Sequence, residues 1–435
     1  MCGIRCCDGC KTVVLGWTIV LVAIGSAGYL FAMTPVDAKT LLVTSDLAKR
    51  LRAHVDYLAS PELKGRKPGT AGNRSAAEYI QARFREMRLE SLPSLRGYGQ
   101  RISSEVGDNL IGVRPAASAG PSSHWILIGA HYDHLGGSYL GADDNASAVG
   151  IMLETARLLP PLAHTHMLFV AFNAEEPPYI RTPLMGSQYF VDHLPAEIDS
   201  PSNLQAVVIM DLMGGVHWEP LRDVIFAAGA EKSPGLYRRL KEAAQARGTR
   251  LEARGQNFPS SPIAHSPSPL AVLPVGLHLV EEVPLLGQVA FSDYDAFRNT
   301  SVPFLFLSAG RTPRYHQPTD LPDTLHYERM AATVEWLLSL AGLIDQDNEP
   351  YRFEASRVEF ADEVASLQPL ATLAADRNTM IPGTSTLSLW RLKRDQEWFK
   401  TLNSAAPSSD DLKRLESLSL RLQCLLADFP ACFLL

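Results

Sequence analysis

Short, unbroken apolar runs alternate with amphipathic segments through the middle of this chain. The apolar runs are too short for ordinary helices, and we predict that they are strands. The segments Ala146–Leu159, Pro234–Ala246 and Tyr327–Ile344 have the spacing of helices. Strands that are apolar throughout are covered on both faces. The pattern therefore predicts an α/β domain with three layers, α/β/α, around a central, mostly parallel mixed sheet; its strands are expected at Trp125–Ala130, His166–Asn173, Ala206–Asp211, Val224–Ala228 and Pro303–Ser308.

Length, composition and charge limit the class of protein. The chain has 435 residues, which is enough for one large domain with an appendage or for two ordinary domains. With 46% hydrophobic and 20% charged residues, it has the composition of a globular protein. The net charge is -7, and Lys and Arg are scattered along the sequence. We therefore expect no nucleic-acid partner.

The N-terminal region contains one long apolar run. It extends from Thr12 to Met33, and no charged residue lies between Lys11 and Asp37. A helix needs about 20 apolar residues to cross a membrane, and a cleaved secretory signal has a shorter apolar core. We predict an uncleaved transmembrane anchor over 12–33. The basic residues before it predict a cytoplasmic tail over 1–11, with the rest of the chain on the periplasmic or extracytoplasmic side.

The remaining chain is divided by composition. We expect a linker over 34–45, a catalytic domain over 46–345 and a helical C-terminal extension over 346–435. An insert over Gly255–Gln288 is rich in proline and serine, which is typical of a functional or disordered loop. The extension is predicted to contain helices over Glu354–Leu373 and Ser409–Leu426, and its role is open, as is any bridge between Cys424 and Cys432.

Acidic and histidine residues stand at or just after the ends of the predicted strands. Zinc binds histidine nitrogen and carboxylate oxygen. A pair of zinc ions needs one carboxylate that can bridge and about two further ligands for each ion. Glu175 is expected to face away from its neighbour Glu176, and it is then free to take a proton from water. The chain offers a full set of candidate ligands: His131, Asp144, Glu176, Asp211 and His316.

Each of these residues also has an ordinary explanation. Asp144 lies in Gly141-Ala-Asp-Asp-Asn, which suits a turn and a helix cap. The glutamate pair suits a solvated turn, and His316 suits a loop. Asp211 is the most informative residue, because an acid at the end of an apolar strand is costly unless it is paired or bound to metal. Together the five residues favour a metal site.

The sequence resembles the M28 family of zinc metallopeptidases, the aminopeptidase-like group. The resemblance spans about Leu51 to Leu343. It rests on the order of the acidic and histidine motifs and on flanking segments, which are Leu63-Lys-Gly-Arg66, Pro68-Gly-Thr70, His131-Tyr-Asp133, Gly141-Ala-Asp-Asp144, Glu175-Glu176, Gly186-Ser187, Asp211 and Tyr315-His316 with Thr319-Asp320.

This resemblance implies two Zn²⁺ per chain and a role for each residue. His131 and Asp211 would complete one zinc site, Glu176 and His316 would complete the other, and Asp144 would bridge them. Glu175 would be the general base. The resemblance also implies that Asp133 orients His131 and that Asp293 matches a Ser-Asp step near the site.

The sequence departs from the family pattern in three places. The segment after Glu176, Pro177–Pro183, is longer than the usual link. Tyr294 stands where many members have histidine, and the insert Gly255–Gln288 has no simple counterpart. We expect all three departures to affect substrate specificity and to leave the metal chemistry intact.

The favoured interpretation is a membrane-anchored dizinc exopeptidase that removes N-terminal residues from peptides. A glutaminyl-cyclase-like zinc aminoacyltransferase, commonly with one metal, and a non-catalytic receptor-like ectodomain are the alternatives. A serine hydrolase is disfavoured, since the sequence has no Gly-x-Ser-x-Gly motif. The sequence leaves open the preferred side chain, amino- against carboxypeptidase action, and the oligomeric state.

Overall fold

The structure, a computed structural model, describes residues 38–118, 124–245, 270–283, 287–347 and 349–428. The predicted tail over 1–11 and anchor over 12–33 lie outside these ranges. Within them, no helix has both the length and the apolar character needed to cross a membrane. The first described helix, α1 (Ala38–Leu58), begins inside the segment expected to be a linker.

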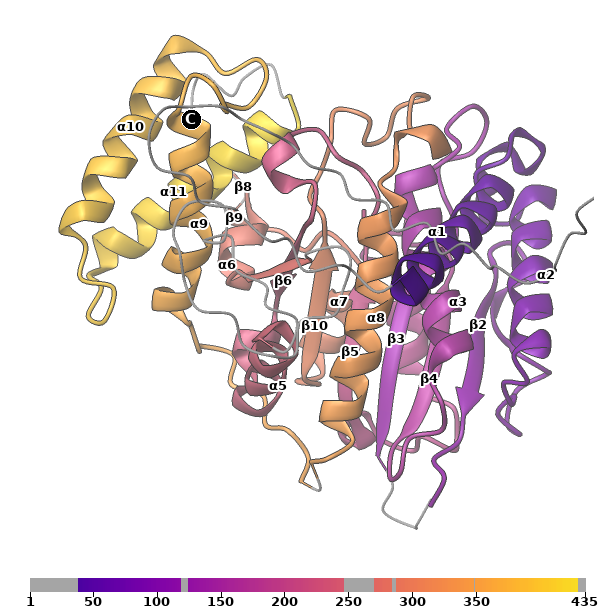
Figure 1. Ribbon diagram of the computed structural model, residues 1–435. Coiled ribbons are helices and arrows are strands. Elements are labelled where there is room, and N and C mark those ends of the chain that lie inside the picture. Colours follow the sequence, from indigo (N-terminus) through magenta and orange to yellow (C-terminus); the bar gives the residue numbers. More distant parts are fainter. Residues whose placement is uncertain (1–37, 119–123, 246–269, 284–286, 348, 429–435) are drawn as a thin grey trace, which may run out of the picture. The chain divides into compact units, whose positions relative to one another are not determined.

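The chain folds around a mixed sheet of eight strands in the order β1-β2-β4-β3-β5-β10-β6-β7 (Figure 1). A separate pair, β8 (Glu282–Val283) and β9 (Gly287–Gln288), is antiparallel. The strands of the large sheet are β1 (Gly99–Ser103), β2 (Gly107–Arg114), β3 (Trp125–His131), β4 (His166–Phe172), β5 (Leu204–Met210), β6 (Val224–Ala228), β7 (Ala271–Pro274) and β10 (Phe304–Ser308).

Four neighbouring strands in the centre of this sheet run parallel. β3 pairs in parallel with β4 and with β5, and β5 pairs in parallel with β10. The strands β2 and β6 on either side are antiparallel to this group. Every residue of β3 and β5 is buried, as expected for strands covered on both faces. The prediction of an α/β fold with a central mixed sheet is confirmed.

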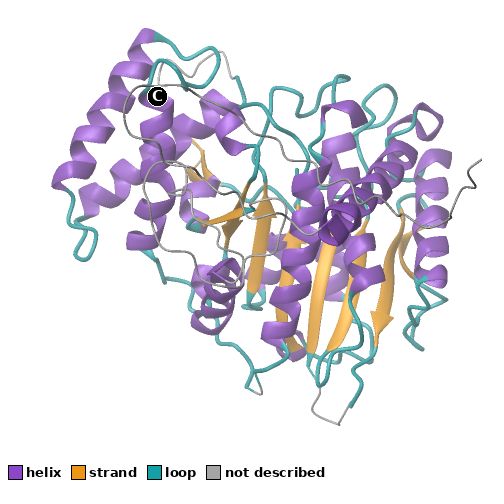
Figure 2. Ribbon diagram, viewed as in Figure 1, coloured by secondary structure: helices purple, strands orange, loops and turns teal. Residues whose placement is uncertain are grey.

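Helices cover both faces of the sheet (Figure 2). Successive side chains of a strand point to opposite faces. Ile126 and Ile128 of β3 accordingly join one apolar core, and Leu127 joins the other. The first core contains α1, α2 (Ala71–Glu86), α3 (Ala148–Leu158), α5 (Pro234–Gln245) and α8 (Tyr327–Ile344). The second contains α4 (Gly186–Asp192), α6 (Leu277–Glu281), α7 (Tyr294–Asn299) and the C-terminal helices.

The C-terminal extension forms three helices that pack at the β7 side of the sheet (Figure 1). They are α9 (Phe360–Ala375), α10 (Thr386–Thr401) and α11 (Ser409–Leu426). α9 contacts β7, and α11 contacts α6 and β8. Strand β7 and helix α6 lie inside the segment expected to be an irregular insert. Where that segment is described, it is therefore part of the folded domain.

Candidate metal centre

The predicted site residues come together at the carboxyl ends of the central strands. His131 ends β3, Glu175 and Glu176 follow β4, and Asp211 follows β5. His316 lies in the loop after β10. The loops that follow parallel strands all lie at the same edge of the sheet, and α/β proteins have their binding sites there. Side chains that are far apart in the sequence meet there because their strands are neighbours.

A first cluster is formed around His131, which is fully buried. Its Nε2 atom lies 3.3 Å from Oδ1 of Asp144 and 3.5 Å from Oδ1 of Asp211. Nε2 of His131 and Oδ1 of Asp211 are both buried and lack a hydrogen-bond partner among the described residues. Buried polar atoms are rarely left without a partner. One nitrogen and two carboxylate oxygens therefore face a common point.

A second cluster uses the other oxygen of Asp144. Nε2 of His316 lies 3.2 Å from Oδ2 of Asp144 and 3.2 Å from Oε2 of Glu176. Asp144 thus offers one oxygen to each cluster. The donor spacing is close to that expected for zinc, because tetrahedral ligands at about 2.0–2.2 Å from the ion lie roughly 3.3–3.6 Å from one another. The residues present therefore suit zinc, and Asp144 belongs to both clusters.

The structure also places His134 at the second cluster, which the sequence reasoning missed. Its Nδ1 atom lies 2.7 Å from Oε1 of Glu176 and 3.9 Å from Oδ2 of Asp144. The donor atoms of His134, Asp144 and Glu176 could also hold a metal ion. The shorter spacing is that of a hydrogen bond, whereas the spacings around His316 match those of two ligands of one ion. The signal available in the sequence was the spacing His131-x-x-His134.

Glu175 lies beside the first cluster. Its Oε2 atom is 3.8 Å from Nε2 of His131, and its Oε1 atom is buried with no hydrogen-bond partner among the described residues. The backbone N–H groups of Glu175 and Glu176 donate to the two carboxylate oxygens of Asp133, at 3.1 and 3.2 Å. The same carboxylate lies 3.7 Å from Nδ1 of His131. The carboxylate of Asp133 is therefore closer to the backbone of Glu175 and Glu176 than to His131.

Three non-glycine residues at the site adopt positive φ angles. Ala174, just before Glu175, has φ 59°, Leu212, just after Asp211, has φ 57°, and His316 has φ 55°. This conformation is uncommon for such residues and persists where the surroundings hold it. Gly141 also has positive φ, and a Cβ there would lie 2.6 Å from the His134 ring. Only glycine fits at this position.

Buried polar side chains hold the loops of the site together. The guanidinium of Arg66, fully buried, donates to the carbonyl oxygens of Tyr132 and Gly141, each at 2.9 Å. The carboxylate of Asp320 accepts the N–H groups of Asp143 and Asp144, at 2.8 and 3.1 Å. These bonds fix the loop that carries Asp144 between the loops that carry His131 and His316. A site held in this way is preorganised.

The carboxylates of the site differ in their pKa values. Burial raises the pKa of Glu175 well above its ordinary value, His131 opposes this shift, and the charges of Asp211 and Glu176 raise the pKa further. Burial acts to raise the pKa of Asp144, but the adjacent imidazoles of His131 and His316 hold it well below the usual range. Burial raises the pKa of Asp293 to about 7. Crowded, buried acids of this kind are typical of a site that binds cations.

Residues 109–264 match peptidase family M28. This part of the chain is therefore similar to that family. Two of its curated relatives are an uncharacterized protein and an aminopeptidase. YfbL of Escherichia coli (strain K12) is 27% identical over 227 residues, which are 49% of this chain and 65% of YfbL. Aminopeptidase YwaD of Bacillus subtilis (strain 168) is 36% identical over 95 residues, which are 21% of this chain and 19% of YwaD. The chain thus spans less than two thirds of either relative.

The fold is shared with solved aminopeptidase structures. One of them is BSAP, a zinc aminopeptidase from Bacillus subtilis. It has a TM-score of 0.50 and 15% sequence identity, and the match covers 68% of this chain and 94% of that protein. At this identity the likeness concerns the fold. The residues of the two donor clusters are of the types that bind zinc.

Proposed function

We propose that this protein is a dizinc exopeptidase that removes N-terminal residues from peptides. One observation carries the proposal, namely that Asp144 offers its two oxygens to two separate donor clusters. The similarity to peptidase family M28 supports peptide-bond hydrolysis. None of the five ligand-type residues is missing, so neither a single-metal cyclase nor a non-catalytic ectodomain is favoured.

Each residue has a distinct part in the proposed reaction. His131 and Asp211 would hold one zinc, Glu176 and His316 would hold the other, and Asp144 would belong to both sites. Two zinc ions bound there would polarise the scissile carbonyl and lower the pKa of water toward about 7. Glu175 accepts a proton from the attacking water and passes it to the departing amine. Its unpartnered Oε1 atom can approach that water.

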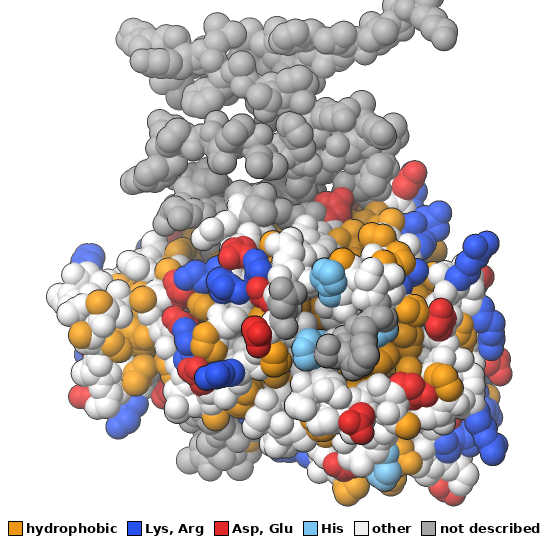
Figure 3. Space-filling view, turned by 90° about the horizontal axis from the view of Figure 1, so that it is seen from below, with side chains coloured by type: hydrophobic (Ala, Val, Ile, Leu, Met, Phe, Trp, Pro, Cys, Tyr) orange, Lys and Arg blue, Asp and Glu red, His pale blue; other side chains and the backbone are white. Residues whose placement is uncertain are grey.

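The relatives support aminopeptidase action in particular. YwaD is named an aminopeptidase, and BSAP is described as a zinc aminopeptidase. We carry this activity over to the present chain as part of the proposal. Figure 3 shows one face of the molecule, on which basic and acidic side chains are interspersed.

The proposed location is the membrane. The apolar run over 12–33 would anchor the chain, and the catalytic domain would lie on the periplasmic or extracytoplasmic side. A protease-protection experiment on intact cells tests this proposal. Digestion of the catalytic domain only after the cytoplasm is opened would contradict it.

Hydrolysis of paired peptides tests the function. The full chain, purified in detergent, is incubated with one unblocked peptide and with its N-acetylated form. We expect release of the first residue from the unblocked peptide alone, loss of this activity with a chelator, and its return with zinc. Cleavage of both peptides at the C-terminal end would contradict aminopeptidase action, and cleavage that survives full chelation would contradict the zinc mechanism.

A further inference from the structure

A large apolar cavity begins at the candidate metal centre. Its volume is about 610 Å³, and Asp211, Leu212 and Tyr315 form the end next to the metal centre. This volume is in the range of small-molecule sites, and it exceeds the space of one leucine or phenylalanine side chain several times. Phe226 and Phe306, from strands β6 and β10, also line it. The cavity therefore reaches the first donor cluster at Asp211.

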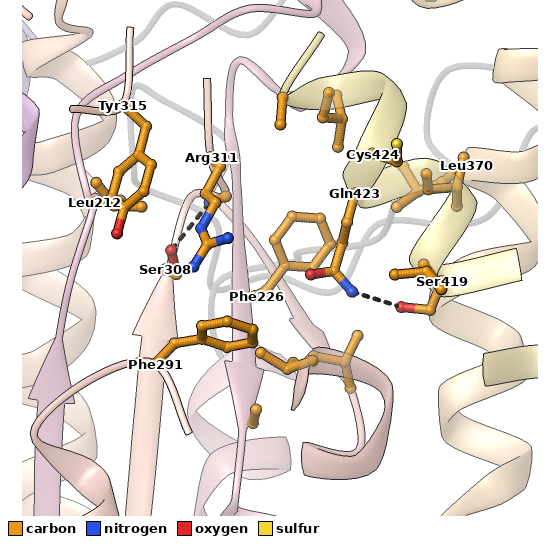
Figure 4. Close-up of a pocket in the computed structure, with 18 of the residues that line it drawn as sticks. Leu212, Phe226, Phe291, Ser308, Arg311, Tyr315, Leu370, Ser419, Gln423 and Cys424 are labelled. Atoms are coloured by element: carbon orange, nitrogen blue, oxygen red, sulfur yellow. Dashed lines mark hydrogen bonds between the residues drawn. The ribbon is translucent and has the colours of Figure 1, made fainter. Parts of the chain in front are cut away.

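The C-terminal extension forms the far wall of this cavity. Leu367 and Leu370 of α9 and Leu422 and Leu426 of α11 line it (Figure 4). Gln423 of α11 points its amide toward Ser419, and Nε2 of Gln423 donates to Leu279 O at 2.8 Å. These helices lie beyond residues 109–264, which match the M28 family. The far wall thus comes from outside the matched residues.

One positive charge stands at the edge of the cavity. The guanidinium of Arg311 lies 4.4 Å from the ring centre of Phe291 and 4.7 Å from that of Tyr315. Figure 4 shows it between these two rings. Arg311 is exposed and forms no ion pair with any residue that the structure describes. Stacking orients its N–H groups, and a guanidinium held in this way recognises a carboxylate by two hydrogen bonds.

We propose that the cavity is the substrate-specificity pocket and that the C-terminal helices complete it. It accepts a large apolar group next to the scissile amide, and Arg311 pairs with a carboxylate of the same substrate. The substrates are then short apolar peptides with a free C-terminus. This inference rests on the proposed peptidase function, because the cavity acts on the substrate only through the adjoining metal centre.

A panel of dipeptides tests the preference. Alanine, leucine or 2-aminodecanoic acid is joined to glycine in both orders, and each dipeptide is prepared as the free acid and as the C-terminal amide. We expect kcat/KM for the 2-aminodecanoyl peptides to exceed that for the alanyl peptides by about tenfold or more. We also expect free acids to be preferred over amides by about tenfold. Equal kcat/KM values for the small and large side chains, and for the free acids and the amides, would overturn the proposal.

Variants assign each preference to its residues. Leu422→Trp should fill the cavity and lower the ratio of kcat/KM for the 2-aminodecanoyl and alanyl peptides by about tenfold. Leu370→Phe fills the same space from α9, so the test can still be made if Leu422→Trp does not fold. Arg311→Gln should reduce the preference for free acids. The matched controls are Leu387→Trp, exposed on α10, and Arg394→Gln, whose guanidinium stacks 4.9 Å from Trp390. Controls that change these ratios as strongly would overturn the assignment.

Binding without catalysis separates this inference from the proposed function. Isothermal titration with 4-phenylbutyrate and with 4-phenylbutanamide is done on the full chain in the presence of a chelator. We expect the acid to bind about tenfold more tightly, and Arg311→Gln to remove the difference. If this holds while peptides are not hydrolysed, the pocket stands and the proposed function fails. The opposite result is also possible: peptides are hydrolysed, but both ligands bind Arg311→Gln and Leu422→Trp as tightly as they bind the unsubstituted chain. In that case the pocket proposal fails and the proposed function stands.

Discussion

In the proposed mechanism, replacement of Glu175 separates catalysis from metal binding. Its carboxylate lies beside the first donor cluster but is not required as a ligand. We expect Glu175→Gln to keep the zinc content and to lower kcat by about 10²–10⁴, because the amide cannot accept the proton of water. Metal analysis and steady-state kinetics of one preparation measure both quantities. Glu219→Gln, at an exposed position, is the control. Turnover that persists in Glu175→Gln would remove this residue from the mechanism.

The two histidines near Glu176 have different expected roles. The spacings of 3.2 Å around His316 are those of two ligands of one ion, and the 2.7 Å contact of His134 is a hydrogen bond that orients Glu176. His316→Gln should therefore lose about one zinc per chain. His134→Gln should keep both ions with about 10–100-fold weaker binding of one of them. Zinc titration against a competing chelator measures this. The reverse result would make His134 the ligand.

Most individual site residues could be predicted from the sequence, but the contacts between them could not. His131, Glu176 and Asp211 could be chosen because each stands near the end of an apolar run. Asp144 and His316 could be chosen because their motifs resemble those of the M28 family. His134 escaped notice because its neighbours only appear once β3 and β4 are paired. Asp133 was expected to orient His131. Its shorter contacts to the Glu175 and Glu176 backbone depend on a turn that no periodicity reveals.

Among the secondary-structure elements, α5 and the end of α8 are joined by an ion pair that makes stability depend on pH. Arg239 donates to both carboxylate oxygens of Asp347, at 2.6 and 2.8 Å. The hydroxyl of Tyr351 donates to the same carboxylate at 2.6 Å. Although burial opposes the charged form, these bonds lower the pKa of Asp347 to about 2. A lowered pKa stabilises the fold above the ordinary aspartate value, and this stabilisation is lost as pH falls toward about 2.

Replacement of this aspartate tests the linkage. We expect Asp347→Asn to lower the free energy of unfolding by about 1 kcal/mol at pH 7, less than the pKa shift alone would give, because the pair is partly exposed. The difference from the unsubstituted chain should shrink below about pH 4. Urea unfolding at several pH values measures it. Asp46→Asn, in an exposed pair with Lys49, should have little effect at any pH. A constant difference down to pH 3 would contradict the assignment.

Most elements with a clear apolar pattern were predicted, but β2, with buried residues Leu110, Ile111 and Val113, was not. The five central runs became strands close to their expected bounds. Strand β1 was missed because its residues alternate between buried and exposed positions without an apolar run. Helix α10 was missed because its buried face includes Ser388 and Asp395, and Asp395 pairs with Arg414 and Arg421. Such polar contacts replace the hydrophobic pattern on which the prediction depends.

For the molecule as a whole, the candidate metal centre is a concentration of buried negative charge. The carboxylates of Asp133, Asp144, Glu175, Glu176 and Asp211 are all buried there. Ions that bind only the folded state stabilise it. We expect a chelator to lower the Tm of the full chain by several degrees and added zinc to restore it. In Asp144→Ala, the chelator should lower the Tm by less, since the shared ligand is absent. An equal shift in both proteins would place the stabilising metal elsewhere.

Zinc stoichiometry tests the central claim most directly. The full chain is purified without added metal and without chelator, and zinc per chain is measured by mass spectrometry beside peptidase activity. The shared position of Asp144 predicts two zinc ions per chain in the active protein and a loss of both metal and activity in Asp144→Ala. An active protein without zinc, or an Asp144→Ala variant that keeps two ions and full activity, would contradict the account.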